Sequence, residues 1–378
     1  MWINYLKITF RNLLKYKLYT LINISGLAIG LASFILIWIY IFDELSYDKY
    51  HSKSKDIYRL VNVYDFEGVG ENSASSPFPV AWTLKNEHPQ LINNVCRVFN
   101  RQVPRTLIQY EDKIFNERRV FFADSTYFQI FDNSFIYGDS KTALNEINSV
   151  VITESTAKKY FGDANPMGKT FRIENSMDLK VTAVIKDVPN NSHLKFDMLA
   201  SLSSMRIPYG GTLPKTWIWN PCWTYLLIEK GKASELETQF PEFVNKFFYD
   251  AEKEHISLYL QALVDIHLKS KLDYEIEPNS NDIYIKILQA IAFFLLLIAI
   301  INYVNLATAT STGRAREVGV KKVFGATRTQ LIYQFLFESI TLSLFGLITA
   351  VFIIELLLPS FNSFSNKDIH ISILLNSK

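Results

Sequence analysis

The sequence has few of the residues that build reactive centres. Of its 378 residues, two are cysteines and six are histidines. No pair of histidines has the H-x-x-x-H or H-E-x-x-H spacing of a metal site, and no G-x-S-x-G motif marks a nucleophilic serine. The net charge of +2 does not indicate nucleic acid as a partner. We therefore expect no metal, no cofactor and no catalytic residue, and a chain that is not an enzyme.

Charge is also nearly absent from three long apolar stretches. Residues 18–42 and residues 287–306 contain no charged residue, and residues 331–358 contain only Glu338 and Glu355. A helix of about 25 residues is about 37 Å long, and a hydrocarbon core of about 30 Å needs roughly 20 residues. The three stretches therefore predict transmembrane helices. The first is too long for the apolar part of a signal peptide and ends in an aromatic boundary, which favours a retained anchor.

The distribution of cations predicts the orientation. The first 17 residues carry four cations and no acid, and the loop between the second and third stretches carries five cations against Glu317 alone. By the positive-inside rule both segments face the cytoplasm. We therefore expect a multi-pass protein of the bacterial inner membrane, with a cytoplasmic N-terminus and with residues 43–282 in the periplasm.

One stretch imitates a phosphate-binding loop. "GDANPMGKT", residues 162–170, ends in Gly-Lys-Thr as a P-loop does, but five residues rather than four separate its glycines. The preceding "TESTAKKYFG" predicts a helix with Thr153 as its cap, and the following "TFRI" predicts a strand. We therefore interpret the stretch as a turn, in which Lys169 is not a phosphate ligand.

The outer residues predict a mixed α/β domain. Strand-like runs lie at 57–64, 94–100, 178–185, 222–229 and 256–263, and helical patterns lie at 80–87 and 234–248. Residues of about 120–220 are richer in Gly, Pro, Asn and Ser, which indicates an inserted lobe. The aromatic run "WIWNPCW" favours a core over a ligand platform. Cys96 and Cys222 lie in an oxidising compartment, so they are either a disulfide or two separate small apolar residues.

The loop "GRAREVGVKKVFGATRTQ", residues 313–330, is the most informative stretch. Read as a helix, it places small residues, among them Gly319, on one face. Gly325 interrupts the pattern, and Thr327 with Gln330 predicts a capping box that starts the next helix. Small residues let a second surface come close; a basic helix lying on anionic lipid is the other interpretation.

The first apolar stretch carries a second pattern of small residues. Gly26 and Gly30 form G-x-x-x-G, and Ala28 and Ala32 repeat the spacing. Such a face lets helices approach closely, so we expect it to pack against another span.

Several stretches resemble one family. "RAREVGVKKVFGATRTQLIYQFLFESI" closely resembles the loop and third span of FtsX/MacB-type permeases of ABC transporters. "NYLKITFRNLLKYKLYTLINISGLAIGLA" resembles the N-terminal elbow and first span of these permeases. "VVITESTAKKYFGDANPMGKTFRI" and "VTAVIKDVPNNSHLKFDMLAS" resemble their periplasmic domain. "VDIHLKSKLDYEIEPNSNDIYI" resembles the run into the second span of Bacteroidetes-like members. The resemblance covers nearly the whole chain.

The resemblance implies a permease subunit without an ATPase of its own. A separate cytoplasmic ABC ATPase docks on the loop, and two permease units, as a homodimer or a duplicated half, form the assembly in the lipid membrane. The periplasmic domain has a porter lobe and an inserted sabre lobe. Such systems export peptides or drugs, extract lipoproteins, or transmit motion to periplasmic enzymes. The loop residues that match the motif are Arg316, Glu317, Val318, Gly319, Lys321, Lys322 and Gly325, and Phe324 lies among them.

The resemblance also sets the expected domain boundaries. They are a cytoplasmic amphipathic elbow at 1–17, spans at 18–42, 283–306 and 331–358, a MacB-like core domain at 43–282, a coupling loop at 307–330 and an outer tail at 359–378. Permeases of this family have four spans in each unit, whereas the sequence predicts three. We therefore expect that the fourth span is absent here. The alternative function is a membrane sensor whose outer domain binds a ligand.

Overall fold

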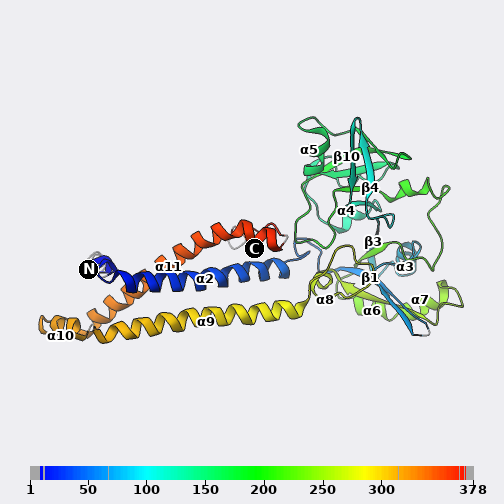
Figure 1. Cartoon of the computed structure of the whole chain (residues 1–378). Helices are drawn as coiled ribbons and strands as arrows, with labels where there is room; N and C mark the ends of the chain where they lie inside the picture. The colour runs from blue at the N-terminus through cyan, green and yellow to red at the C-terminus, as the bar shows by residue number, and fades with distance from the viewer. Residues whose placement is uncertain are drawn as a thin grey trace. The chain divides into compact units, whose positions relative to one another are not determined.

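The computed structural model describes residues 9–11, 13–66, 68–313, 315–365, 367–369 and 371. The chain divides into two compact units. A helical unit comprises Met1–Leu45 with Asp282–Lys378, and an outer unit comprises Ser46–Asn281. Both are drawn in Figure 1.

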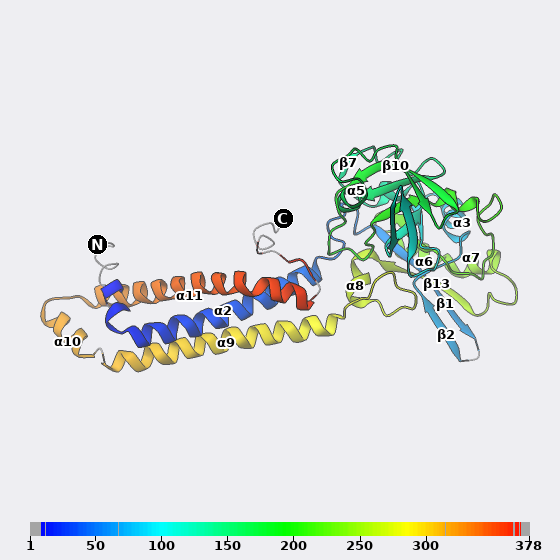
Figure 2. The same ribbon diagram turned by 45° about the horizontal axis from the view of Figure 1, so that its top comes forward.

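The helical unit contains three helices that are long and apolar enough to cross a membrane: α2 (Lys17–Leu45), α9 (Asp282–Gly313) and α11 (Arg328–Ser365). Within this unit they lie side by side, and α2 contacts both of the others (Figure 2). Each is longer than the apolar stretch that predicted it, because its polar ends continue the same helix.

The largest difference lies at the end of α11. The helix continues through Pro359 to Ser365, so it includes residues 359–365, which we expected to belong to the outer tail. Residues 366, 370 and 372–378 of that tail lie outside the described residues, as do residues 1–8 and 12 of the expected elbow.

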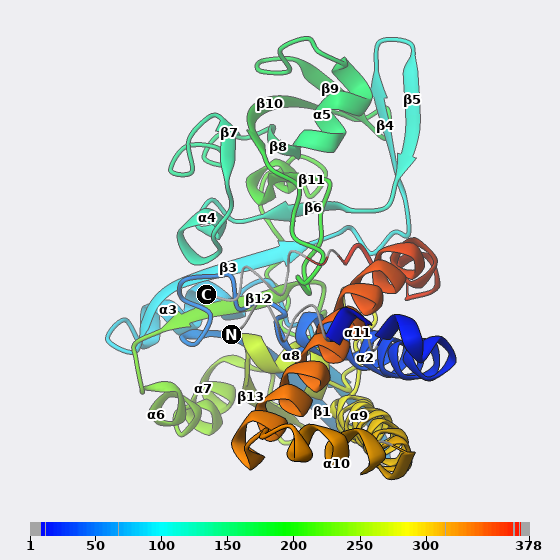
Figure 3. The same ribbon diagram turned by 90° about the vertical axis from the view of Figure 1, so that its left-hand side faces the viewer.

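The outer unit is a mixed α/β structure, as predicted. Its described strands form one sheet in the order β13-β1-β12-β3-β6-β11-β8-β10-β9-β4-β5, with β2 on β1 and β7 on β10 (Figure 3). The strands are β1 (Ile57–Phe66), β2 (Val69–Ser73), β3 (Ile92–Phe99), β4 (Thr106–Tyr110), β5 (Lys113–Glu117), β6 (Val120–Ala123), β7 (Phe135–Tyr137), β8 (Ser149–Thr153), β9 (Thr170–Ile173), β10 (Met177–Ile185), β11 (Met198–Ser201), β12 (Trp223–Ile228) and β13 (Ile256–Ala262). The pairs β8–β10 and β6–β11 are parallel, and the other pairs are antiparallel.

The sheet is buried on both faces. Neighbouring residues of β8 divide between two core clusters, with Val151 in one and Val150 and Ile152 in the other. Since successive side chains of a strand point to opposite faces, the two clusters cover opposite sides of the sheet. Cys96 and Cys222 also divide in this way, and both are free and buried. The structure therefore shows two separate small apolar residues rather than a disulfide.

Helices cover the part of the sheet made by β13, β1, β12 and β3. They are α3 (Val80–Glu87), α6 (Ala233–Glu237) and α7 (Phe240–Phe247), whose apolar residues pack with these strands in a third cluster. The single helix expected at 234–248 is therefore wrong. Pro241 lies in the first turn of α7, where its missing N–H is tolerated, but it cannot continue a helix from α6.

The strands β4 to β11 follow β3 and precede β12, so they form an inserted block. The block begins at Thr106, because β4 pairs with β9. The compositional boundary near residue 120 misses the hairpin of β4 and β5, whose residues are not rich in turn formers.

The phosphate-loop look-alike is a turn, as predicted. Helix α5 (Glu154–Phe161) begins at Thr153, whose Oγ1 accepts a hydrogen bond from the Thr156 N–H at 3.4 Å. Gly162 and Gly168 have φ of 61° and 77°, and β9 follows. The short helices α4 (Tyr127–Ile130) and α8 (Ile266–Lys269) and the 3-10 turns Leu202–Arg206 and Leu263–Asp265 complete the unit.

The aromatic run at 217–223 packs inside the outer unit. Trp217 stacks on Phe247 with the ring centroids 5.6 Å apart, and Trp219 lies edge-on to Phe78 at 5.7 Å. Trp223 is buried and donates from Nε1 to the Tyr274 carbonyl at 2.8 Å. The rings therefore contribute to cores, as the sequence favoured.

Candidate coupling site

The coupling loop folds as a short helix between two long ones. α10 (Ala315–Val323) follows α9 and precedes α11, and Figure 2 shows it at the end of the helical unit where both meet. Two of its apolar side chains are exposed, Val320 at 52% and Val323 at 85%, and Phe324 directly after the helix is 87% exposed. Exposed apolar side chains of this kind are available to contact a second surface, either protein or lipid.

Gly319 lies in the same exposed stretch. A Cβ atom at this position would meet no atom within 4 Å among the described residues. Glycine is therefore not required here by packing within the chain. A small residue in open space leaves room for a second surface to approach closely.

A sharp break connects α10 to α11. Gly325 has φ of 87°, a left-handed conformation that favours glycine. Two residues later the capping box that we predicted is confirmed. The Thr327 N–H donates to Gln330 Oε1 at 3.0 Å, and the Gln330 N–H donates to Thr327 Oγ1 at 3.3 Å. The start of α11 is thus fixed directly beside the loop.

One side-chain bond also joins α10 to α11. Lys321 Nζ donates to Gln334 Oε1 at 3.1 Å, and Gln334 is buried. Lys322 is exposed and Val318 is half-buried. For Arg316 and Glu317 the helix is described but the side chains are not. The loop thus reaches α11 through the capped break and through Lys321.

Small residues bring the long helices together. A Cβ atom on Gly26 would lie 3.1 Å from Asn302 Nδ2, and one on Gly30 would lie 2.5 Å from the Ala299 Cβ. Both contacts are with α9 of the same chain. The glycines therefore allow α2 and α9 to touch within one unit, and their effect on assembly stays a prediction.

The alanines of α2 occupy another side of the helix. Ala28 and Ala32 are buried in a cluster with Ala350 and Ile354 of α11. α2 therefore presents one small-residue face to α9 and another to α11.

The outer unit holds a buried ion pair that our sequence reasoning missed. Arg59 of β1 is fully buried, and its Nη1 and Nη2 donate to the two carboxylate oxygens of Glu275 at 2.5 and 2.7 Å. Nη2 also donates to Gln261 Oε1 at 2.6 Å and to Ser270 Oγ at 3.0 Å. A single arginine inside the apolar run "IYRLVNVY" was the available signal. The ion pair fixes residues 270–281, which lead to α9.

A second polar cluster fixes the residues that follow α2. Asp48 is fully buried, and its Oδ1 accepts from the His193 N–H at 3.2 Å and from Ser192 Oγ at 3.3 Å. The same oxygen lies 3.0 Å from His193 Nδ1, and His193 Nε2 lies 2.7 Å from the Tyr225 hydroxyl. Burial raises the pKa of that hydroxyl, so it stays protonated. The segment is thereby connected to the central strand β12.

His51 strengthens the same attachment. Its Nδ1 accepts from the Asp132 N–H at 3.0 Å, and its ring lies against Phe131 with centroids 5.2 Å apart. Burial lowers the pKa of His51 to about 4, which keeps the imidazole neutral and able to accept. Both segments that lead out of the outer unit are therefore attached to buried side chains of that unit.

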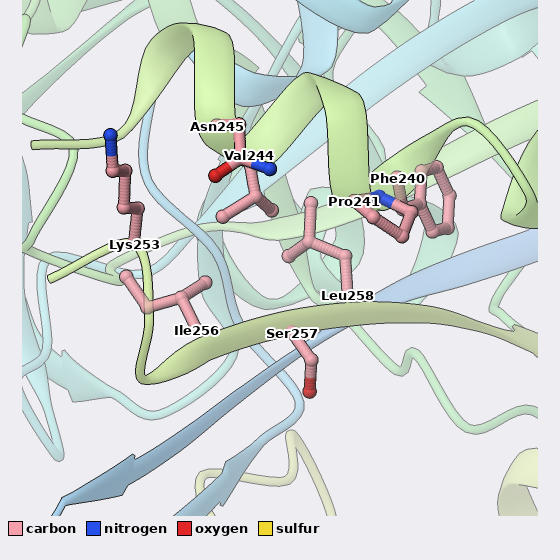
Figure 4. A pocket seen from close by; sticks show the side chains of 8 residues that line it. All are labelled: Phe240, Pro241, Val244, Asn245, Lys253, Ile256, Ser257 and Leu258. Carbon is pink, nitrogen blue, oxygen red and sulfur yellow. The ribbon is translucent and has the colours of Figure 1, made fainter. Parts of the chain in front are cut away.

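A ligand site for a sensor has less support. Figure 4 shows a groove between α7 and β13, in which Val244 and Leu258 face one another and Ser257 points away. Lys253 at its edge already pairs with Asp250 at 2.7 Å. Its lining residues provide no set of converging polar groups, which small-molecule sites use to orient a ligand. Among the described residues, no three His, Cys, Asp or Glu side chains gather as metal ligands.

Three helices long and apolar enough to cross a membrane and a mixed α/β unit are the features of a membrane protein with a folded domain beside its spans. Residues 20–235 match the family model described as the MacB-like periplasmic core domain, and residues 290–377 match the FtsX-like permease C-terminal model. The chain belongs to the FtsX/MacB-type family of ABC transporter permeases.

Three related proteins align with different lengths of this chain. It is 26% identical over 215 residues to the uncharacterized ABC transporter permease YknZ of Bacillus subtilis, which covers 57% of this chain and 48% of that one. It is 23% identical over 211 residues to the macrolide export ATP-binding/permease protein MacB of Aggregatibacter actinomycetemcomitans, covering 54% and 29%. It is 22% identical over 366 residues to the uncharacterized permease YvrN of Bacillus subtilis, covering 92% and 85%.

The chain thus matches about half the length of YknZ and less than a third of MacB. The solved extracellular domain of YknZ is 15% identical with a TM-score of 0.39, and the match covers 53% of this chain and 98% of that domain.

Proposed function

We propose that this chain is the permease subunit through which a separate cytoplasmic ABC ATPase drives work in the cell envelope. The observation that carries the proposal is the exposed surface of α10 formed by Val320, Val323, Phe324 and Gly319. Exposing these apolar residues of the loop to water is unfavourable, whereas a protein partner bound to α10 would bury them.

The connection to α11 supports a mechanical role for that surface. The capped break after Gly325 is short, so a displacement of α10 is not absorbed by a long flexible linker. α11 packs on α2, and α2 packs on α9. A push on the loop therefore reaches three apolar helices together.

The work itself belongs to one of three kinds: export of a molecule, extraction of a lipoprotein, or transmission of motion to a periplasmic enzyme. MacB is named for macrolide export, and a relative from Pseudomonas aeruginosa for pyoverdine export. Both names include an ATP-binding part, which supports an ATPase as the partner of this permease. A second permease unit completes the proposed assembly.

Site-specific photocrosslinking tests the docking. A photoreactive amino acid at Val320 should crosslink to the ABC ATPase of the proposed assembly, when the two are expressed together. The same amino acid at Ile29, an exposed position in the middle of α2, serves as the control. Crosslinks at Val320 to lipid alone would contradict the proposal and favour the interpretation of a helix that rests on the membrane.

A further inference from the structure

His267 contacts both of the segments that connect the outer unit to the spans. The exit segment, residues 46–56, follows α2, and the return segment, residues 270–281, leads to α9. The Tyr47 ring of the exit segment stacks on the His267 ring with centroids 3.4 Å apart and planes 3° apart. The backbone N–H of Ser280 in the return segment donates to the His267 carbonyl at 2.9 Å.

His267 is itself held in place by the core. Its neighbours Leu263 and Ile266 are fully buried in the cluster that covers one face of the sheet. His267 is 6% exposed and Tyr47 is 9% exposed, so both residues are largely buried. A stacked pair that is buried in this way resists rotation of either ring.

Each segment also has its own attachment to the unit. The exit segment is fixed through Asp48 to His193, which contacts Tyr225 of β12, and the return segment is fixed through Glu275 to Arg59 of β1. Arg59 and Tyr225 are partners in the sheet, so these two attachments are connected through paired strands. His267 adds a direct connection, because its ring contacts the exit segment and its backbone contacts the return segment.

We propose that Tyr47 and His267 form a clasp that makes the exit and return segments of the outer unit move as one element. The clasp rests on the proposed function, because these two segments are the ones that join the outer unit to α2 and to α9 along the chain. Tyr47 and His267 are positioning residues: they bind no substrate, and they set how displacement in one segment is shared with the other.

Hydrogen–deuterium exchange of the full chain in lipid nanodiscs, without the ATPase, tests the clasp. Tyr47→Ala should speed exchange of the Ser280 amide by roughly tenfold, although Tyr47 does not bond to it, because loss of an aromatic pair loosens His267. Tyr47→Phe keeps the stack and should restore slow exchange. If Tyr47 acts only within the exit segment, Tyr47→Ala should speed exchange only in residues 46–56.

A matched control is Lys53→Ala. It removes another contact of the exit segment, the bond from Lys53 Nζ to the Gln129 carbonyl at 2.7 Å, and should leave the Ser280 amide unchanged. If Tyr47→Ala does not fold, Tyr47→Leu keeps bulk but loses the planar contact and takes its place. Unchanged exchange at Ser280 in the stack-deficient variant, with amides of β8 still protected, would overturn the clasp.

This result is separate from the docking test. Exchange at Ser280 reports the clasp in the permease alone, so it can fail while the ATPase still crosslinks to Val320. If Val320 gives no crosslink to the ATPase while Tyr47→Ala still speeds exchange of the Ser280 amide, the docking site is rejected and the clasp is retained.

Discussion

A Cβ atom on Gly30 would lie 2.5 Å from the Cβ of Ala299, so α2 and α9 meet at a point where only hydrogen fits. Gly30→Leu should force the two helices apart and destabilise the helical unit by about 1–3 kcal/mol, since overpacking a tight contact displaces its neighbours. Gly30→Ala should have a smaller effect in the same direction. The measurement is the thermal unfolding midpoint of the chain in detergent.

The adjacent residue provides the control. Ile29 is 60% exposed on the same helix, so Ile29→Phe should leave the midpoint nearly unchanged. If Gly30→Leu and Ile29→Phe unfold at the same temperature, the contact between α2 and α9 does not depend on glycine.

Removal of Arg59 should have a large effect on the outer unit. Arg59→Leu leaves the Glu275 carboxylate without its partner, and breaking a buried pair costs about 3–5 kcal/mol. Replacing both residues with leucine should recover part of this loss. Urea unfolding followed by tryptophan fluorescence measures the change. Lys232→Ala removes an exposed pair with Glu235 and should leave the unfolding curve nearly unchanged. Equal losses in Arg59→Leu and Lys232→Ala would contradict the buried-pair account.

The stability of the outer unit should fall in acid because of His51. Burial lowers its pKa in the folded state to about 4, whereas the unfolded side chain has a pKa of about 6.5. Between these values the unfolded chain binds the proton and the folded chain does not. The stability that depends on a neutral His51 is therefore fully present above about pH 6.5. About 3 kcal/mol of it is lost as the pH falls from 6.5 to 4.

His51→Asn tests this pH dependence, because it keeps an acceptor for the Asp132 N–H but does not titrate. Urea unfolding of both proteins at a series of pH values should show a shallower decline for the variant. Parallel curves for the two proteins would show that His51 is not the group responsible.

Much of the architecture followed from local patterns in the sequence. The spans were predicted because uncharged runs of about 20 residues have few stable alternatives to a membrane helix. The capping box at Thr327 and the turn after Phe161 were predicted because their residue types act over three to five positions. The break before Pro241 was missed, because the apolar spacing continues across it. The helical backbone cannot continue there, since proline lacks the N–H that a helix interior requires.

The long-range contacts could not be predicted in the same way. Arg59 and Glu275 are 216 positions apart, and all thirteen described strands of the sheet lie between Tyr47 and His267 in the sequence. The strands β4 and β5 were missed for a related reason. Most residues of β5 are exposed, so the hairpin lacks the alternation by which half-buried strands are recognised.

The predicted orientation can be tested by labelling intact cells with a membrane-impermeant thiol reagent. A cysteine introduced at Ser140, in the outer unit, should react from outside. A cysteine introduced at Thr312, near the loop, should react only after the cells are opened, because the positive-inside rule predicts that the cations around it face the cytoplasm. Cys96 and Cys222 are buried and should give little background. Labelling of Thr312→Cys in intact cells would reverse the topology.

The most direct test of the account is a bulky residue at Gly319 in the assembled transporter. A Cβ atom added at Gly319 would meet no atom within 4 Å among the described residues, apart from its own helix backbone and chain neighbours. Gly319→Trp should therefore insert and fold normally. Gly319→Ala, which adds little bulk, is the matched variant. Co-purification with the ABC ATPase and ATP-driven activity are measured in parallel. We predict that Gly319→Trp loses stable ATPase binding or the coupling of hydrolysis to transport, while Gly319→Ala retains both. Normal ATPase binding and normal transport by Gly319→Trp would contradict the proposal that α10 is the docking site.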